Sequence, residues 1–133
     1  MLAEDNPGDV RLFREALDSL ALSFELIVAE DGEKAIAVVK NTSCHISGSQ
    51  ALDLIVLDVN LPRHKGDEVL RQVRSEPTLG NIPVIVMTSS EAPADKATAT
   101  WLGADLYIRK PSDLEELLEV AKVIEKVLKR NAP

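Results

Sequence analysis

A single carboxylate ends the most apolar run of this chain. The run, Leu54–Leu57, contains no polar residue and is typical of a strand buried on both faces of a sheet. Asp58 follows it directly, and Glu4-Asp5 follow the apolar run Met1–Ala3 in the same way. Three carboxylates that converge repel one another, and a hard divalent cation such as Mg²⁺ relieves that repulsion. If the two runs are parallel neighbours, the sequence predicts a metal-binding acidic cluster.

Two later apolar runs also end in groups that could take part in chemistry. The run 82–87 is followed by hydroxyl groups at 88–90, and the run 106–108 is followed by the cations Arg109-Lys110. Acid, metal, hydroxyl and ammonium together suit phosphoryl transfer, which needs positioning and charge neutralisation. Each group alone has a plain explanation as a helix-end charge, a solvated strand end, a turn residue or a surface lysine. Their joint occurrence at four strand ends favours the functional interpretation.

Short apolar runs alternate with helical patterns, and this alternation predicts the elements that position these groups. The expected strands are 1–3, 24–29, 54–57, 82–87 and 106–108; the expected helices begin at Pro7, Gly32 and Gly66 and cover 94–102 and 113–129. Strands that alternate with helices form a parallel sheet covered on both faces, here a doubly wound α/β domain. In such a sheet, ligands gather at the carboxyl ends of the strands, where Asp58 lies.

Local signals mark the ends of several elements. Asn6 is expected to cap the first helix, because asparagine is a preferred N-cap residue. Pro7 would then be the first helical residue, a position that tolerates the missing N–H of proline. Gly103 should end the helix 94–102, since glycine tolerates positive φ. Ser112 and Glu115 match a capping box for the last helix. The segment 41–52 is expected to be a solvated loop.

Composition excludes several classes of protein. The 133 residues suit one domain, and no apolar stretch is long enough to span a membrane. With 15 Lys+Arg against 22 Asp+Glu, the net charge is −7, which disfavours direct nucleic-acid binding. The sole cysteine, Cys44, cannot form an intrachain disulfide and fits a reducing compartment, the cytoplasm.

Four motifs cover nearly the whole chain. They are "AEDNPGDVRLFREAL" at 3–17, "DLIVLDVNLPRHKGDEVL" at 53–70, "IPVIVMTSS" at 82–90 and "LGADLYIRKP" at 102–111. Together they resemble the receiver domain of response regulators in two-component signalling. The resemblance implies a flavodoxin-like sheet of five parallel strands in the order 2-1-3-4-5, with helices on both faces. It also implies a single receiver domain over 1–133, without an output domain.

The resemblance implies roles for the acidic residues. Asp58 corresponds to the phosphoacceptor, which attacks the phosphohistidine of a sensor histidine kinase. Glu4, Asp5 and Asp58 correspond to the carboxylates that hold Mg²⁺, and the backbone carbonyl of Asn60 is the further ligand. The implied activity is limited to the protein's own phosphorylation and dephosphorylation, so the chain is expected to be a signalling protein and not an enzyme.

The resemblance also implies roles for three residues on later strands. Thr88 and Lys110 complete the catalytic set around the phosphoryl group. Thr88 and the aromatic Tyr107 correspond to a switch that changes conformation on phosphorylation. The bond Lys110-Pro111 corresponds to a cis peptide in the family.

Partners follow from the same resemblance. The sensor kinase is hypothesised to be of the phytochrome type, because the start of the chain, the segment 41–52 and 89–95 are similar to receivers found beside such kinases. The phosphorylated domain would then dock a downstream protein target, pass the phosphoryl group to a phosphotransfer protein, or pair as a homodimer. No nucleic acid and no membrane are expected as direct partners.

Two other classes of protein remain as alternatives. A small-molecule phosphatase or phosphotransferase with an aspartyl-phosphate intermediate typically carries a second acid two residues after the nucleophile, where this chain has Asn60. A flavin-binding domain of the same fold would favour a phosphate loop after the first strand, where Glu4-Asp5 would repel phosphate.

Overall fold

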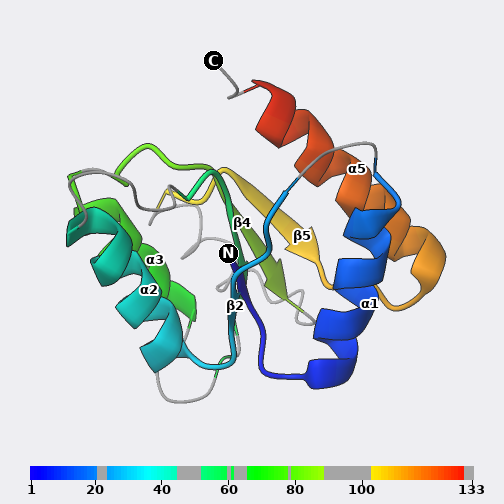
Figure 1. Ribbon diagram of the computed structural model, residues 1–133, viewed down its shortest axis with the longest axis horizontal. Coiled ribbons are helices and arrows are strands. Elements are labelled where there is room, and N and C mark those ends of the chain that lie inside the picture. Colours follow the sequence, from blue (N-terminus) through cyan, green and yellow to red (C-terminus); the bar gives the residue numbers. More distant parts are fainter. Residues whose placement is uncertain are drawn as a thin grey trace.

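A computed structural model of the chain contains a five-stranded parallel sheet between two layers of helices (Figure 1). The structure describes residues 1–20, 24–44, 52–59, 61, 66–77, 79–88 and 103–130, without the side chains of 42–44 and 88. The strands are β1 (Leu2–Ala3), β2 (Val28–Ala29), β3 (Ile55–Asp58), β4 (Val84–Thr88) and β5 (Leu106–Arg109). Their order is β2-β1-β3-β4-β5, and every neighbouring pair is parallel. The doubly wound sheet and its strand order are therefore confirmed.

Helices cover both faces of the sheet. On one face lie α1 (Pro7–Asp18) and α5 (Leu114–Arg130), and on the other lie α2 (Gly32–Cys44) and α3 (Gly66–Ser75) (Figure 1). The expected helix 94–102 falls outside the described residues. Among the described helices, none combines the length and the apolar character needed to cross a bilayer.

The central strand β3 contributes to two separate cores. Ile55 and Leu57 pack into the core under α2 and α3, whereas Leu54 and Val56 pack into the core under α1 and α5. This alternation follows from the period of two along a strand. The apolar run before Asp58 is thus buried on both faces, as its composition predicts.

Two boundaries differ from the sequence prediction by more than two residues. Strand β2 has two residues where 24–29 was expected, because within the described residues it pairs only with β1, which is itself two residues long. Helix α2 continues through Cys44, so the prediction of a loop over 41–52 is wrong for 41–44. Once a helix has formed, each further residue adds a hydrogen bond, and the modest helix propensity of Asn, Thr and Ser does not stop it.

The start of α1 confirms the predicted cap. The side chain of Asn6 accepts hydrogen bonds from the backbone N–H groups of Gly8 at 2.9 Å and Asp9 at 3.3 Å. Gly103 has φ of +91°, which confirms the conformation expected of it, although 94–102 itself lies outside the described residues.

The cap of α5 lies one residue later than predicted. The carboxylate of Asp113 accepts the backbone N–H of Glu116 at 2.8 Å, so Asp113 is the N-cap. The Glu116 carboxylate reaches back to the backbone N–H of Ser112 at 2.9 Å. The predicted Ser112–Glu115 capping box is therefore wrong, because an aspartate one residue later satisfies the same unpaired N–H groups.

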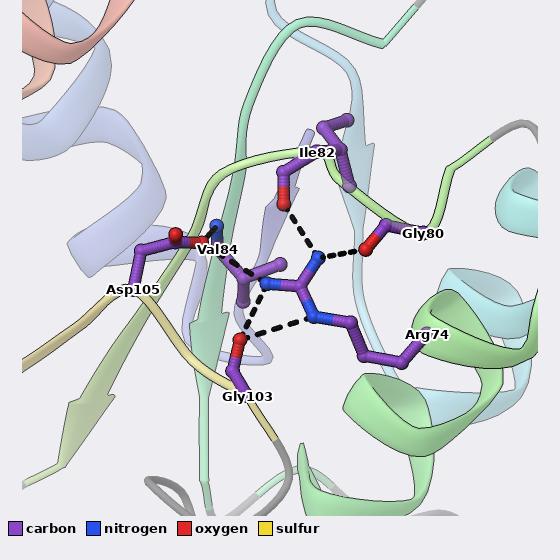
Figure 2. Close-up of polar contacts among 6 residues, drawn as sticks. All are labelled: Arg74, Gly80, Ile82, Val84, Gly103 and Asp105. Carbon is purple, nitrogen blue, oxygen red and sulfur yellow. Dashed lines mark hydrogen bonds and ion pairs between the residues drawn. The ribbon is translucent and has the colours of Figure 1, made fainter.

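Arg74, at the end of α3, connects segments far apart in the sequence (Figure 2). Its guanidinium donates hydrogen bonds to backbone carbonyls of Gly80, Ile82 and Gly103 and to the carboxylate of Asp105. The Asp105 carboxylate also accepts the backbone N–H of Val84 at 2.8 Å. This Arg74 clasp, formed by the residues drawn in Figure 2, joins α3 to the segments that lead into β4 and β5. It lies at the amino ends of these strands, opposite the edge that carries Asp58.

Candidate functional site

Parallel register brings the acidic residues after β1 and at the end of β3 to one edge of the sheet. Ala3 pairs with Leu57, so the next residues, Glu4 and Asp58, lie side by side at the carboxyl ends of β1 and β3. Both are buried, with 2% and 5% of their surface exposed. The backbone N–H of Glu4 donates to the carbonyl of Ala29 at 3.0 Å, which continues the pairing beyond β1. The sheet therefore holds both carboxylates in place.

The predicted acidic cluster is present. Glu4, Asp5 and Asp58 each offer a carboxylate oxygen, and these oxygens lie within 4.8 Å of one another. Glu4 Oε1 accepts the backbone N–H of Asn6 at 3.2 Å. Glu4 Oε2 is buried and accepts no hydrogen bond from the described part of the chain. Three carboxylates this close together, two of them buried, fit a hard divalent cation.

Lys110 reaches the same cluster from the end of β5. Its Nζ lies 2.9 Å from Glu4 Oε2, 2.9 Å from Asp9 Oδ2 and 3.2 Å from Asp58 Oδ2. The contact with Glu4 is an ion pair without hydrogen-bond geometry, whereas the contact with Asp58 is also a hydrogen bond. A cation is thus in place beside the buried carboxylate of Asp58.

The peptide bond between Lys110 and Pro111 is trans, since the described residues contain no cis bond. The cis bond that the resemblance implied is therefore wrong for this structure. The trans form of an X–Pro bond is favoured by about 0.5–1 kcal/mol. With this trans bond, Lys110 reaches the carboxylates of the cluster.

Burial and charge shift the titration of the site in predictable directions. Burial raises the pKa of Glu4 to about 7, and the neighbouring Asp58 charge adds to the rise while Lys110 opposes it. For Lys110, burial alone would lower the pKa, but contacts with Glu4, Asp9 and Asp58 outweigh it and raise the pKa. The lysine is therefore a permanent cation, and Glu4 holds a proton more readily than an exposed carboxyl.

The remaining predicted site residues are only partly visible. Thr88 is the last residue of β4 and pairs with Arg109, but its side chain lies outside the described part. Asn60 also lies outside it. Tyr107 is half-buried and packs against the core under α2 and α3. Its hydroxyl is buried, and within the described residues it has no hydrogen-bond partner.

The structure adds a contact that the sequence analysis missed. Asp9 lies in the first turn of α1 and meets Lys110 at 2.9 Å. An acidic residue in the first turn of α1, four residues after Asp5, was the available signal. Both Asp9 and Lys110 line a pocket of about 140 Å³, which also borders Glu4 and the exposed Leu114. The pair is thus accessible from the side of α1 and α5.

Gly66 is the second residue whose role was missed, since the sequence identified it only as the start of a helix. A Cβ at this position would lie 2.7 Å from the carbonyl oxygen of Asp58 and 2.8 Å from Cα of Val59. Its backbone N–H donates to the carbonyl of Val59 at 3.0 Å. Glycine therefore lets the start of α3 close against the backbone of Asp58.

The comparisons with known proteins agree with this arrangement. The family model of the response regulator receiver domain matches residues 1–122, so the chain belongs to that family. Response regulator Rcp1 of Synechocystis sp. (strain ATCC 27184 / PCC 6803 / Kazusa) is 34% identical over 125 residues, which cover 94% of this chain and 84% of Rcp1. Response regulator MprA of Mycobacterium sp. (strain KMS) is 35% identical over 127 residues, and the chain spans only 50% of its length.

Solved structures give the same result. The phosphorylated cyanobacterial phytochrome response regulator RcpA matches with a TM-score of 0.85 and 35% identity, covering 99% of this chain and 94% of RcpA. The Mn²⁺-bound form of Rcp1 matches with a TM-score of 0.83 and 32% identity, with the same coverage of 99% and 94%. The phosphatase and flavin-binding alternatives are not favoured by these findings.

Proposed function

We propose that this receiver domain accepts a phosphoryl group on Asp58 from a sensor histidine kinase, in a Mg²⁺-dependent reaction, and signals by a change of conformation. One arrangement supports this function most directly. Asp58 is a buried carboxylate at the end of β3, in a cluster with Glu4 and Asp5 whose oxygens lie within 4.8 Å of one another. Lys110 Nζ lies 3.2 Å from it.

The proposed reaction is a direct transfer. A carboxylate oxygen of Asp58 attacks the phosphorus of a phosphohistidine, an O–P bond forms, and the P–N bond breaks with its electron pair leaving on the imidazole. The product is an acyl phosphate, which water can later hydrolyse. Bound Mg²⁺ would neutralise charge on the phosphoryl oxygens. Lys110 supplies a fixed positive charge beside the new group, and the chain catalyses only its own phosphorylation and dephosphorylation.

The proposed metal ligands are the carboxylates of Glu4, Asp5 and Asp58 and the backbone carbonyl of Asn60. The carboxylate oxygens of Glu4, Asp5 and Asp58 lie within 4.8 Å of one another, which supports this set. The Mn²⁺-bound form of the relative Rcp1 supports a divalent cation. Mg²⁺ and Mn²⁺ both prefer carboxylate and carbonyl oxygens, so the same ligands suit either ion.

We further propose that the signal leaves through β5 and α5. The hydroxyl of Thr88 and the ammonium of Lys110 would follow the phosphoryl group, and Tyr107 would change its rotamer in response. Phosphorylation adds about −1.5 to −2 charge units, which gives the two states different interactions. The altered face would dock a protein target or a phosphotransfer protein, or pair with a second copy as a homodimer.

The proposed kinase is of the phytochrome type and the proposed location is the cytoplasm. The match to RcpA, a phytochrome response regulator, supports this kinase. The net charge of −7 supports protein partners over nucleic acid.

The decisive experiment is incubation with Mg²⁺ and acetyl phosphate, followed by intact-protein mass measurement. Wild type should gain the mass of one phosphoryl group, and Asp58→Asn should gain none while remaining folded. Asp53→Asn is the matched control, because Asp53 is an exposed aspartate just before the same strand. Normal labelling of Asp58→Asn, or none of wild type, would refute the proposal.

A further inference from the structure

The ammonium group of Lys110 is shared by carboxylates in two different environments. Glu4 and Asp58 are deeply buried, with side chains 2% and 6% exposed. Asp9 is 41% exposed and belongs to α1, yet its oxygen is as close to Lys110 Nζ, at 2.9 Å, as that of Glu4. Asp9 is also outside the group of carboxylates that could together hold a metal ion.

These positions allow Asp9 a role different from that of the metal-binding carboxylates Glu4 and Asp58. A divalent cation held by Glu4 and Asp58 would compete with Lys110 for the same oxygens, because two positive groups at one site repel. Asp9 is the described carboxylate in contact with Lys110 that does not belong to the metal cluster. It can therefore keep the ammonium close to Asp58 while the cluster binds a cation.

We propose that Asp9 is a positioning residue for Lys110, which holds the ammonium beside the metal-loaded site and releases it when a phosphoryl group arrives on Asp58. This inference rests on the proposed function. Lys110 would then exchange the Asp9 carboxylate for phosphoryl oxygens, and the contact between the end of β5 and the first turn of α1 would break. Phosphorylation would in this way also change the contacts of α1.

An ordinary structural role for Asp9 leads to different expectations. An acidic residue in the first turn of a helix complements the helix dipole. If this were the only role of Asp9, its replacement would lower stability slightly and the effect would not depend on Lys110. A general loss of negative charge would change ion binding whether Lys110 is present or not. A double-mutant cycle with Lys110 separates these effects.

The experiment uses wild type, Asp9→Asn, Lys110→Ala and the double variant, at about 0.15 M salt to screen distant charges. Mg²⁺ is titrated first, and beryllofluoride, which mimics the phosphoryl group, is then titrated at saturating Mg²⁺. With Lys110 present, Asp9→Asn should weaken Mg²⁺ binding and tighten beryllofluoride binding, each roughly two- to fivefold, as expected for one partly exposed ion pair. In the Lys110→Ala background the Mg²⁺ effect should vanish. Asp9→Glu should restore wild-type behaviour.

Two results would overturn the inference alone: unchanged affinities in Asp9→Asn, or an equal Mg²⁺ effect in both backgrounds. Wild type that binds neither ligand would overturn the proposed function itself, and this inference with it. Thermal unfolding of all five proteins, Asp9→Glu included, checks that folding is intact.

Discussion

Replacing Arg74 with alanine should lower the free energy of unfolding by at least about 3 kcal/mol. The side chain is only 19% exposed and donates hydrogen bonds to three backbone carbonyls and one carboxylate (Figure 2). Truncation would leave the partly buried carbonyls of Gly80 and Ile82 without the donor that now lies 3.1 and 2.7 Å away.

The magnitude follows from the environment of each bond. A hydrogen bond from a charged donor contributes about 1.5–3 kcal/mol, and two such bonds reach partly buried carbonyls. The bonds to Gly103 are exposed, so water can replace them. The ion pair with Asp105, which is 54% exposed, adds at most about 1 kcal/mol. Arg74→Lys should recover less than half of the loss, because one ammonium cannot reproduce the planar fork of donors.

Urea unfolding at equilibrium measures this loss as a lower midpoint at an unchanged slope. Arg71→Ala is the matched control, since Arg71 is exposed on the same helix and its removal should change stability by less than about 0.5 kcal/mol. If Arg74→Ala lowered the free energy of unfolding no more than Arg71→Ala does, the Arg74 clasp would not contribute to stability, and the prediction would be wrong.

Three further expectations concern the site. Gly66→Ala should destabilise the fold by about 1–3 kcal/mol and slow phosphoryl uptake, because its Cβ would lie 2.7 Å from a backbone oxygen of Asp58; urea unfolding and a time course of intact mass test this. Gly80→Ala, whose Cβ would lie no closer than 3.5 Å to its neighbours, is the control, and an equal effect would contradict the argument. Mg²⁺ affinity should fall as pH drops below about 7, up to tenfold per unit, because the proton on Glu4 must leave before the carboxylate binds metal. Titrations from about pH 5.5 to 7.5 should show this dependence in wild type and not in Glu4→Gln; a flat wild-type profile would exclude it. Without metal, the same shift should make the fold less stable as pH rises from 4.5 to about 7, since the folded protein binds this proton more tightly than the unfolded chain.

Local chemistry explains which predictions from the sequence succeeded. Asn6 before Pro7 identified the start of α1, and the unbroken apolar run before Asp58 identified a strand buried on both faces. The alternation of strands and helices led to a parallel sheet, and a parallel sheet places strand ends together. The meeting of Glu4, Asp5 and Asp58 could therefore be predicted before any distance was known.

Contacts between distant segments needed the tertiary structure. The approach of Asp9 to Lys110 depends on how α1 packs against α5, which follows β5, and the reach of Arg74 to Gly103 and Asp105 depends on how α3 lies against the strand starts. Such contacts leave no periodic signal, because they join residues far apart in the sequence through the orientation of whole elements.

The corrected boundaries have the same origin. The length of β2 is set by its pairing with the short strand β1. The cap of α5 depends on which of two adjacent side chains, Ser112 or Asp113, accepts the unpaired N–H of Glu116. The sequence by itself determined the class of fold and the acidic cluster, since both depend on local patterns repeated along the chain. Only the tertiary structure decided which carboxylates share Lys110 and what closes against Asp58, because packing sets those distances.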